Sequence, residues 1–314
     1  MTVDIIIPTY KPDETLCLLL HKLQGHTFVV HRVIILNTEE ELWKQATAAY
    51  PIEQVLKELP CEYEVFHIAK KDFDHGGTRN MGASISKADI VLYITQDAMP
   101  ADEHLIEEFI KVFEAHSDIG VAYGRQLPKN DCNIIERFTR RFNYPEKSRI
   151  KSKSDLNELG IKTFFCSDVC AAYRRNYLLG AGGFEDPTIF NEDMIFAGKR
   201  ILAGDKVAYV AEAKVLHSHN YTGRQQFHRN FDLAVSQAQY PEVFEGVPSE
   251  GEGIRMVKAT ARYLIRNEQP LKVIILMYQS GCKYIGYFLG KRYKKLPMRI
   301  VMKCTSNPNY WKKS

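Results

Sequence analysis

The sequence lacks the cysteine patterns of a disulfide framework or a zinc finger. Its seven cysteines are odd in number and scattered, no CxxC pair occurs, and Cys166 and Cys170 have no second ligand pair at zinc-finger spacing. Most of them lie within apolar segments. The sequence therefore predicts small, buried, free thiols in a reducing compartment.

A leader segment and a membrane-spanning run are also missing from the pattern. Met1 is followed almost at once by a predicted strand at residues 3–8, so we expect no signal peptide. The longest apolar stretch, residues 273–289, is interrupted by Lys283 and two polar residues, whereas a transmembrane helix needs about 20 apolar residues. These absences predict a cytoplasmic protein.

Acidic residues are absent from the last 46 positions. Residues 1–268 carry 32 basic and 38 acidic side chains, and residues 269–314 carry ten basic ones and no acidic one. The net charge of +4 thus divides into −6 and +10. Because the basic residues are confined to the tail and the body is acidic, nucleic-acid binding is disfavoured.

The tail combines this charge with an apolar helical stretch at residues 271–289. Such a segment is typical of a helix at the surface of an anionic membrane, where each basic residue contributes about 1 kcal/mol. We therefore expect peripheral association of residues 269–314 with the inner face of the cell membrane. The alternative is packing against a neighbouring helix or against a second subunit in a homo-oligomer.

Short apolar runs alternate with helical patterns in the first third of the chain. Strands are expected at residues 3–8, 29–36, 63–68 and 90–95, and helices at 12–23, 40–50 and 78–87. This alternation is typical of a parallel sheet covered by helices on both faces. Ligands of such sheets bind at the carboxyl ends of the strands, where residues 8–11, 37–38 and 95–97 are expected.

The rest of the chain is less regular. Residues 143–162 are polar and basic and predict a mobile loop, after which residues 163–173 are expected to return to the sheet. A helix is expected at 192–203, followed by two short strands at 207–210 and 213–216. Further helices are expected at 225–237, 254–266 and 271–289.

Two clusters of candidate functional residues lie in the first hundred residues. Residues 72–80 place Gly76 and Gly77 at the start of a helix, beside Arg79, which suits a cradle for a diphosphate. The alternative is an ordinary loop-to-helix junction. Asp97 follows a buried strand, where a carboxylate suits a divalent cation with phosphate oxygens, or else the N-terminal cap of the next helix.

Two more clusters lie after residue 190. Glu192 and Asp193 open a helix, whose positive dipole end stabilises carboxylates, so a general base or a simple cap fits there. His217 and His219 follow the strand expected at 213–216. We expect the two imidazoles to point to opposite faces, so that one of them meets a metal.

These four clusters, in this order and spacing, resemble the family 2 inverting glycosyltransferases of the GT-A fold. The resemblance covers residues 3–232. It includes the opening VDIIIPTY at residues 3–10, the RNMG at 79–82, and the AGGFE at 181–185 that precedes Asn191, Asp193, Arg200, Gly204 and His217. Residues 74–80 and 95–98 are most similar to the rhamnosyltransferase branch, whose donor is dTDP-L-rhamnose.

The resemblance implies an α/β protein: a mostly parallel, Rossmann-like sheet flanked by helices, with a helical extension. The catalytic domain is expected at 1–232, with a nucleotide-binding half at about 1–100, an acceptor-binding half at about 101–232, and a basic extension at 233–314. It also implies transfer to a hydroxyl of a cell-surface polysaccharide or a lipid-linked saccharide.

Residue roles follow from the same resemblance. Asp193 is the expected general base, and a Mn²⁺ or Mg²⁺ ion is expected at Asp97 with His217 or His219. Asp168, Asn191 and Glu192 are expected to line the acceptor or sugar pocket. The nucleotide sugar is expected to contact Pro8, Thr9, Tyr10, Asn37, Arg79, Asn80, Gln96 and Asp97.

The sequence departs from the family pattern in three places. Thr95 replaces the first Asp of the metal motif, and Asn37 and Thr38 replace the Asp pair that commonly follows the second strand. Residues 226–230 lack the Trp of the processive members, which favours a non-processive enzyme. The alternatives are a UDP-hexose donor, or an idle nucleotide-binding domain with a membrane- or partner-binding tail.

Overall fold

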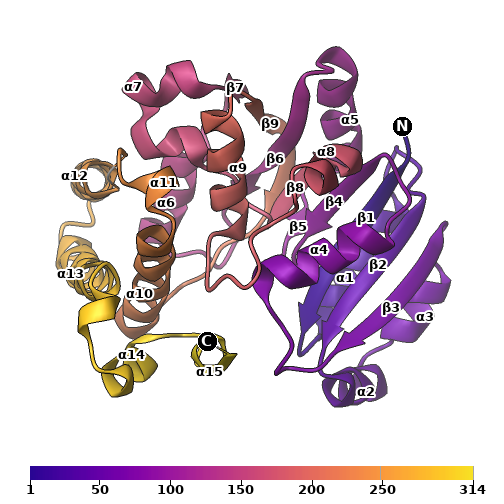
Figure 1. Ribbon diagram of the computed structural model, residues 1–314, viewed down its shortest axis with the longest axis horizontal. Helices are drawn as coiled ribbons and strands as arrows, with labels where there is room; N and C mark the ends of the chain where they lie inside the picture. Colours follow the sequence, from indigo (N-terminus) through magenta and orange to yellow (C-terminus); the bar gives the residue numbers. More distant parts are fainter. Residues whose placement is uncertain (248, 314) are drawn as a thin grey trace.

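A single central sheet organises the computed structural model, which describes residues 1–247 and 249–313. The strands follow the order β3-β2-β1-β4-β8-β6-β9-β5, and β7 pairs with the outer side of β9. Strands β1 to β4 are parallel to one another, as expected, whereas β8 runs antiparallel to both β4 and β6. The sheet is therefore parallel in its first half and mixed beyond it (Figure 1). The strand bounds are β1 Val3–Tyr10, β2 Arg32–Thr38, β3 Glu62–Ile68, β4 Ile90–Ile94, β5 Met99–Pro100, β6 Ile119–Leu127, β7 Arg149–Lys151, β8 Cys170–Arg174 and β9 Lys206–Leu216.

Helices cover both faces of this sheet and form the whole C-terminal part of the described chain (Figure 1). The α-helices are α1 Glu14–Gln24, α2 Glu40–Ala49, α3 Ile52–Lys57, α4 His75–Ile85, α5 Leu105–Ala115, α6 Ile134–Asn143, α7 Leu156–Leu159, α8 Arg175–Gly180, α9 Glu192–Leu202, α10 Gly223–Gln239, α11 Pro241–Phe244, α12 Glu250–Arg266, α13 Lys272–Gly290, α14 Met298–Cys304 and α15 Tyr310–Lys313. Three short 3₁₀ turns lie at Lys153–Asp155, Gly160–Phe164 and Tyr293–Lys295.

The two faces of the sheet bury separate apolar cores. Ile5 and Ile7 of β1 belong to the core under α1, α3 and α5, whereas Ile6 belongs to the core on the other face. Successive side chains of a strand point to opposite faces, so a strand covered on both sides needs a continuous apolar run. This is why the apolar runs near the N-terminus predicted β1, β2 and β4 correctly, whereas the edge strand β3, which was also predicted, has no continuous apolar run.

The middle of the chain is more ordered than its polar composition predicted. Residues 143–162 hold β7, α7 and two 3₁₀ turns, where we expected a mobile loop. The segment 163–173 returns to the sheet only at Cys170, and the two strands expected at 207–210 and 213–216 are one strand, β9. The register between β6 and β9 shifts at this point: Gly124 pairs with Val210 and Arg125 pairs with Lys214, so residues 211–213 form a bulge within β9.

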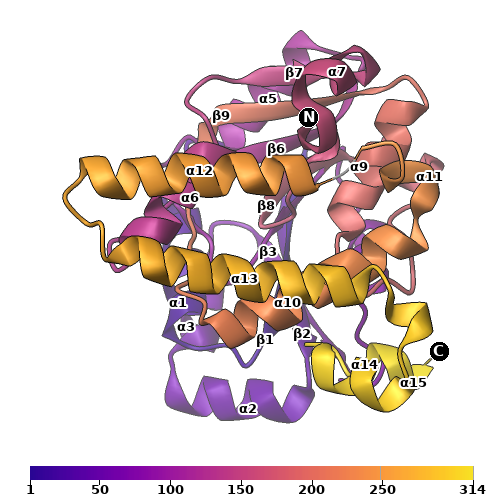
Figure 2. The same ribbon diagram turned by 90° about the vertical axis from the view of Figure 1, so that its left-hand side faces the viewer.

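The C-terminal helices pack on the body rather than extending from it. α13 lies along α10, and α12 contacts both α13 and α6 (Figure 2). Gly286 and Gly290 permit this approach, because a Cβ at either position would lie 2.2 or 2.3 Å from a carbonyl oxygen of α10. Residue 232, the expected end of the catalytic domain, lies inside α10. Within the described residues, none of the helices combines the length and the apolar character that crossing a bilayer requires.

Candidate active site

The loops after β1, β2 and β4 meet at the carboxyl edge of the sheet. Buried Thr9 donates a hydrogen bond from Oγ1 to Oδ1 of Asn37 at 3.2 Å. The side-chain amide of Gln96 bonds the backbone of Tyr10 twice, accepting from its N–H at 3.0 Å and donating to its carbonyl at 3.3 Å. The structure thus brings together four of the expected nucleotide-contacting residues, and Pro8 precedes them in β1.

Two lysines flank Tyr10: Lys11, which lies in the expected segment 8–11 but was not among the expected donor contacts, and Lys70, which the sequence analysis missed. Lys70 donates from Nζ to the Tyr10 hydroxyl at 3.1 Å, and the ammonium groups of Lys11 and Lys70 lie 5.5 and 5.4 Å from the ring centre. Both lysines are exposed. Lys11 has a φ of 50°, an uncommon conformation for a residue other than glycine. The position of Lys11 at the end of the first strand was the sequence signal that could have identified it as a candidate donor contact.

Asp97 lies against two imidazoles. Its Oδ2 atom is 3.4 Å from Nε2 of His217 and 3.2 Å from Nε2 of His219, and Thr95 donates to its Oδ1 at 2.8 Å. Burial opposes ionisation of this carboxyl group, yet its contacts with the imidazoles and with the hydroxyl of Thr95 hold its pKa well below the usual range. The helix after Asp97 begins only at Leu105, so Asp97 is not a helix cap.

The expectation that the two imidazoles point to opposite faces was wrong. Their Nε2 atoms are 3.0 Å apart, and the ligand atoms of Asp97, His217 and His219 all lie within 4.8 Å of one another. Residues i and i+2 of an extended segment project to the same side, so the spacing itself places both rings together. Asp97, which lies beyond β4, thus faces both imidazoles.

A buried glutamine fixes the orientation of His217. Oε1 of Gln126 accepts from Arg140 and lies 2.9 Å from Nδ1 of His217. Because arginine has only donors, the atom of Gln126 that faces Arg140 must be the amide oxygen. An amide oxygen only accepts, so His217 must donate its Nδ1–H to it. Burial lowers the pKa of His217 to about 4, so the ring is neutral at pH 7 and its Nε2 lone pair faces Asp97. An oriented Nε2 of this kind is what a metal ion requires.

A second group of site residues, the carboxylate cluster, surrounds Arg79. Its Nε atom is 3.0 Å from Oδ2 of Asp168, and its Nη1 atom is 2.9 Å from Oε1 of Glu192. All three side chains are less than 10% exposed. Burial raises the pKa of Asp168 to about 7 despite the guanidinium, whereas Arg79 holds the pKa of Glu192 below its usual value against the cost of burial. The structure thus commits Arg79 to two carboxylates, and its expected contact with a diphosphate stays a prediction.

Asp193 completes this cluster at the first turn of α9. Its Oδ2 accepts from the backbone N–H of Asp168 at 2.9 Å, and its Oδ1 accepts from its neighbour Met194 at 2.7 Å. Burial raises the pKa of Asp193 well above the usual range, and the adjacent charges of Glu192 and Asp168 raise it further. A fixed carboxylate with a raised pKa has the properties of a general base.

The Asp97–imidazole cluster and the carboxylate cluster around Arg79 lie at the same end of two adjacent strands, β4 and β8. The backbone N–H of Thr95, just after β4, donates to the carbonyl of Val169, just before β8, at 3.1 Å. Gln126 also donates to Oγ of Ser167 at 3.0 Å, and Ser167 precedes Asp168. The neighbours of the Asp97–imidazole cluster therefore connect to the carboxylate cluster through one short segment.

The expected diphosphate cradle at residues 72–80 is filled by the chain itself. Asp74 caps α4 by accepting from the N–H groups of Gly76 and Gly77, and a Cβ at Gly76 would lie 1.9 Å from the carbonyl oxygen of Glu185. The glycines thus permit close approach of the segment after β8 and α8, not of a ligand. Asn80 exchanges two 2.8 Å hydrogen bonds with the backbone of Phe184 and so joins α4 to the same segment.

Asn191, expected in the acceptor pocket, has a structural contact. Its Nδ2 donates to Oγ of Ser236 in α10 at 2.7 Å, and its φ of 63° sets the start of α9. This bond fixes the direction in which Glu192 and Asp193 enter the site.

The sequence has close relatives among curated proteins. It is 39% identical to the O-antigen chain rhamnosyltransferase RfbN of Salmonella typhimurium, over 99% of this chain and 96% of that protein. It is 41% identical to the O-antigen chain rhamnosyltransferase WbaN of Salmonella anatum, over 78% of each.

Solved structures with the same fold are more distant in sequence. The mannosyltransferase PcManGT of Pyrobaculum calidifontis, solved with GDP-Man and Mn²⁺, matches 94% of this chain and 88% of its own with a TM-score of 0.58 at 12% identity. S. aureus TarS 1–349 in complex with UDP-GlcNAc matches 94% and 92% with a TM-score of 0.53 at 13% identity. The sequence model described as glycosyl transferase family 2 matches residues 4–179. The chain belongs to this family and is a glycosyltransferase of the GT-A fold.

Proposed function

We propose that this enzyme transfers L-rhamnose from dTDP-L-rhamnose, with inversion, to a hydroxyl of a cell-surface polysaccharide or a lipid-linked saccharide. The observation that carries the reaction type is the pairing of a raised-pKa carboxylate, Asp193, with the Asp97–imidazole cluster at one sheet edge. The sugar and the class of acceptor, an O-antigen chain, are supported by the names of the two relatives.

We propose a divalent cation at Asp97, His217 and His219. One carboxylate oxygen and two imidazole nitrogens form a donor set that suits Mn²⁺ better than Mg²⁺, because Mg²⁺ prefers oxygen ligands. When bound, such an ion offsets the negative charge that develops on the departing nucleoside diphosphate. Gln126 contributes by holding Nε2 of His217 free of a proton.

The protein's own groups account for donor binding. Tyr10 and Gln96 form a hydrogen-bonded surface on which the base and ribose are expected to rest. Thr9 and Asn37, which bond each other at the ends of β1 and β2, are buried. The ammonium groups of Lys11 and Lys70 beside Tyr10 add positive charge for the donor's phosphates, and Arg79, which pairs with Asp168 and Glu192, is the further cation expected to approach the diphosphate.

Asp193 would accept the proton of the acceptor hydroxyl as that oxygen attacks the anomeric carbon. The backbone N–H of Asp168 fixes the carboxylate, and Arg79 keeps Asp168 and Glu192 in place around it. A single displacement with a base on the acceptor side inverts the anomeric centre. Positioned proton transfer of this kind accelerates reactions by about 10²–10⁴-fold.

A donor screen tests this proposal. Thermal stability is measured with dTDP-L-rhamnose, UDP-glucose, UDP-galactose and UDP-N-acetylglucosamine, each with and without Mn²⁺. We expect the largest rise in Tm for dTDP-L-rhamnose with Mn²⁺, since a ligand that binds only the folded state stabilises it. A response to a UDP-sugar together with none to dTDP-L-rhamnose would overturn the donor assignment.

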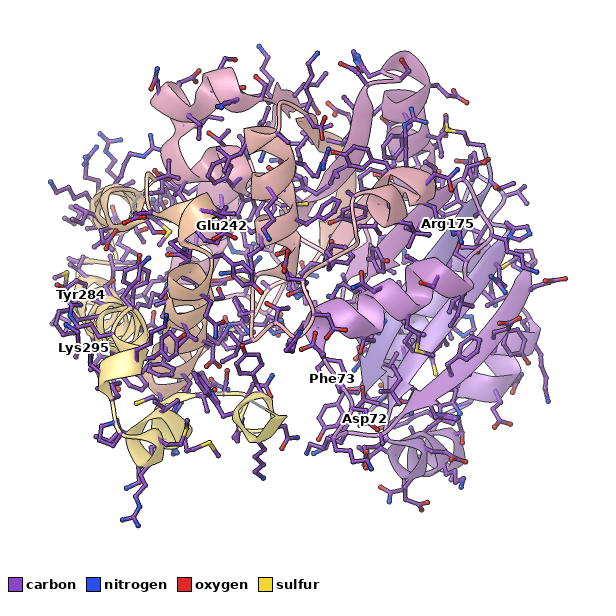
Figure 3. The ribbon with its side chains drawn as sticks, viewed as in Figure 1. Asp72, Phe73, Arg175, Glu242, Tyr284 and Lys295 are labelled. Carbon is purple, nitrogen blue, oxygen red and sulfur yellow. The ribbon has the colours of Figure 1, made fainter. Side chains whose placement is uncertain are left out.

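We also propose that the C-terminal helices rest on an anionic membrane. α13 buries one side against α10 and exposes Ile274, Ile275, Tyr278, Ile285 and Phe288, which recur at helical spacing along the other side and are each more than 40% exposed. Tyr284 and Lys295 project from the same edge of the molecule (Figure 3). Basic residues follow directly at 291–295.

Vesicle flotation tests the membrane proposal. Deleting residues 269–314 would strip the cover from α10 and leave Asp232 without the hydroxyls of Thr305 and Ser306, so substitutions are preferable. We expect Ile274→Gln with Ile285→Gln to reduce binding to phosphatidylglycerol vesicles, while Leu18→Gln, at an exposed apolar residue of α1, leaves it unchanged. Equal flotation of the unmodified protein, the Ile274→Gln/Ile285→Gln variant and the Leu18→Gln variant would contradict the proposal.

A further inference from the structure

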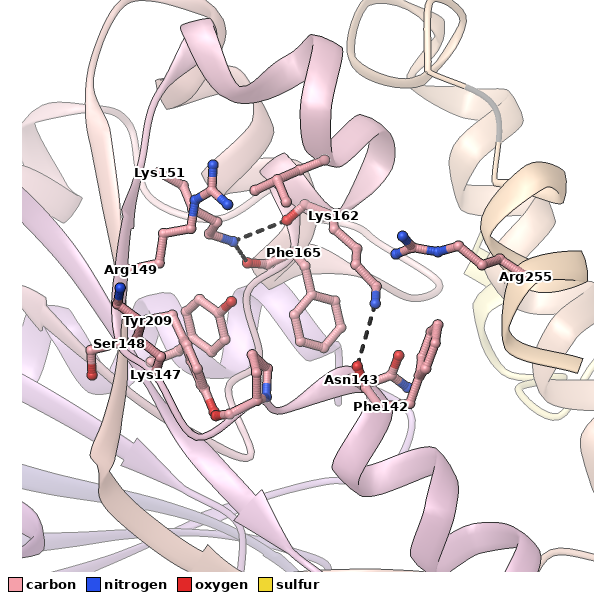
Figure 4. Close-up of a pocket in the computed structure, with 13 residues that line it drawn as sticks. Phe142, Asn143, Lys147, Ser148, Arg149, Lys151, Lys162, Phe165, Tyr209 and Arg255 are labelled. Atoms are coloured by element: carbon pink, nitrogen blue, oxygen red, sulfur yellow. Dashed lines mark hydrogen bonds between the residues drawn. The ribbon is translucent and has the colours of Figure 1, made fainter. Parts of the chain in front are cut away.

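A pocket of about 510 Å³ lies between the sheet and the C-terminal helices, apart from the residues placed in the active site. Its walls come from β6, β7, β9, the end of α6 and the 3₁₀ turn at Gly160–Phe164, and Arg255 of α12 faces it from the opposite side (Figure 4). The segment that we expected to be a mobile loop supplies most of this lining. Neither the fold nor the proposed transfer chemistry explains the pocket.

The lining contains five basic side chains and no acidic one. These are Lys147, Arg149, Lys151, Lys162 and Arg255. Just outside the pocket, Arg149 pairs with Asp155 and Glu158, while Lys162 and Arg255 share the single carboxylate of Glu252. Neither Lys147 nor Lys151 forms an ion pair with any carboxylate in the part of the chain that the structure describes. The pocket therefore carries an excess of positive charge.

Lys151 is the group that most requires a ligand. It is 3% exposed, and its Nζ donates to the carbonyl of Lys162 at 3.2 Å and to that of Phe165 (Figure 4). The same ammonium lies 4.7 Å from the ring centre of Tyr123. Burial with only carbonyls and a ring face lowers the pKa of Lys151 to about 7, because no charge of opposite sign offsets the lost hydration of the ammonium group. An anion in the pocket would supply that charge.

Aromatic rings form the other walls. Tyr123 and Tyr209 have ring centres 5.2 Å apart, and Phe165 meets Tyr123 edge-on at 5.7 Å. Phe142 forms a further wall near Lys162, whose ammonium lies 4.2 Å from its ring centre. Such walls suit a ligand with an apolar face, as a pyranose ring has, rather than a bare inorganic anion.

We propose that this pocket binds a pyranose that carries a phosphate or diphosphate, as part of the acceptor. The cations would hold the phosphate, and the aromatic walls would face the sugar ring. This inference rests on the proposed glycosyltransfer to a lipid-linked saccharide. It goes beyond it by placing the acceptor's anionic end in a site distinct from the donor site.

Two structural relations support this assignment. Phe165, whose carbonyl binds Lys151, lies three residues before Asp168, so one short segment runs from the pocket to the carboxylate cluster. α12, which carries Arg255, packs beside α13 on the same side of the molecule (Figure 2). A saccharide phosphate on a lipid anchor could therefore enter from the surface that we propose to rest on a membrane.

Calorimetric titration with a soluble probe, α-D-glucose 1-phosphate, tests the site without requiring turnover. Methyl α-D-glucoside and inorganic phosphate are titrated separately, and we expect each to bind at least tenfold more weakly than the sugar phosphate. Lys151→Met and Arg255→Met are expected to weaken binding of the sugar phosphate at least tenfold. Arg255 is 63% exposed, so its replacement keeps the test valid if Lys151→Met fails to fold.

Controls separate this proposal from the proposed function. Lys22→Met, at an exposed lysine of α1, should bind the probe as the unmodified enzyme does, and both pocket variants should keep their Mn²⁺ and nucleotide affinity. Asp193→Asn should bind the probe normally even if it cannot transfer sugar. Probe binding that is unchanged in Arg255→Met and in any folded Lys151→Met, or inorganic phosphate binding as tightly as the sugar phosphate, would overturn the proposal.

Vesicles carrying a polyprenyl-diphosphate-linked hexose then show whether the site also accepts a lipid-linked source. Loss of binding to these vesicles in Arg255→Met is expected.

Discussion

Asp97 and Asp193 lie at one edge of the same sheet but have opposite electrostatic environments. Asp97 faces two imidazoles and a hydroxyl, and these hold its pKa well below the usual range. Asp193 is surrounded by Glu192, Asp168 and apolar neighbours, and its pKa is raised. A carboxylate that stays ionised suits a cation, and one that readily takes up a proton suits a base.

This difference cannot be read from the residue type and has to come from the neighbours. Asp97 obtains its neighbours from a loop 120 residues further along the chain, at His217 and His219. Asp193 obtains a like charge from the adjacent residue, Glu192, and Arg79, which pairs with Glu192, opposes the resulting rise in the pKa of Asp193 only in part. Substitutions at and around Asp97 and Asp193 test whether the two carboxylates have separate roles.

The largest effect is expected for Asp193→Asn. Loss of the base should lower kcat by about 10²–10⁴-fold, because proton removal by a positioned group contributes that much. Rhamnose transfer is measured with radiolabelled donor, and donor affinity is measured separately by calorimetry. Transfer at the normal rate would show that another group removes the proton.

Arg79→Met should be the most destabilising change in the site. It leaves Asp168 and Glu192 buried without a cation, and breaking a buried pair in this way costs about 3–5 kcal/mol in the free energy of unfolding. Urea denaturation gives this quantity. Arg200→Met, at a more exposed pair with Asp205, is the matched control and should cost far less. A loss under about 1 kcal/mol for Arg79→Met would contradict the arrangement around Asp168.

Gln126→Met should act mainly on the Asp97 cluster. Without the amide oxygen, His217 loses the acceptor that fixes its Nδ1–H, and removal of such a partner lowers metal affinity by about 10–100-fold. Mn²⁺ titration followed by electron paramagnetic resonance measures this affinity. The pH profile of transfer at saturating Mn²⁺ should stay unchanged, and a shifted profile would mean that Gln126 also acts on the base.

Glu192→Gln should produce the smallest effect, a displaced pH profile. The base must be ionised, so transfer falls as the pH drops through the pKa of Asp193. Removing the adjacent negative charge lowers that pKa, and the acid limb should therefore move to lower pH. Glu185→Gln, which breaks a pair with Lys199 outside the cluster, is the control. An acid limb that stays in place or moves upward would contradict the assignment.

The sequence predicted the parts of the site that follow directly from strands. Apolar runs located β1, β2 and β4, so Thr9, Asn37 and Asp97 were correctly placed at the carboxyl edge. The role of Gly76 and Gly77 was not predictable, because the segment at residues 185–188 that packs against them lies more than 100 positions away. Polar residues such as Gln126 and Ser167 give no periodic signal, and only tertiary contacts reveal their function.

The pocket was hidden for a similar reason. Residues 143–162 are polar and basic, a composition typical of loops, yet β7 pairs with β9 and buries Lys151 there. Strand pairing with a distant partner overrides local propensity. Composition reflects only the local propensity, so it indicated a mobile loop at residues 143–162.

Titration of Mn²⁺ into Asp97→Asn and Asp193→Asn tests the separation of roles most directly. The account predicts that Asp97→Asn loses Mn²⁺ affinity at least tenfold, while Asp193→Asn binds Mn²⁺ as the unmodified enzyme does. Unchanged Mn²⁺ affinity in both variants, or the same loss of Mn²⁺ affinity in both, would contradict the claim that the two carboxylates have different functions.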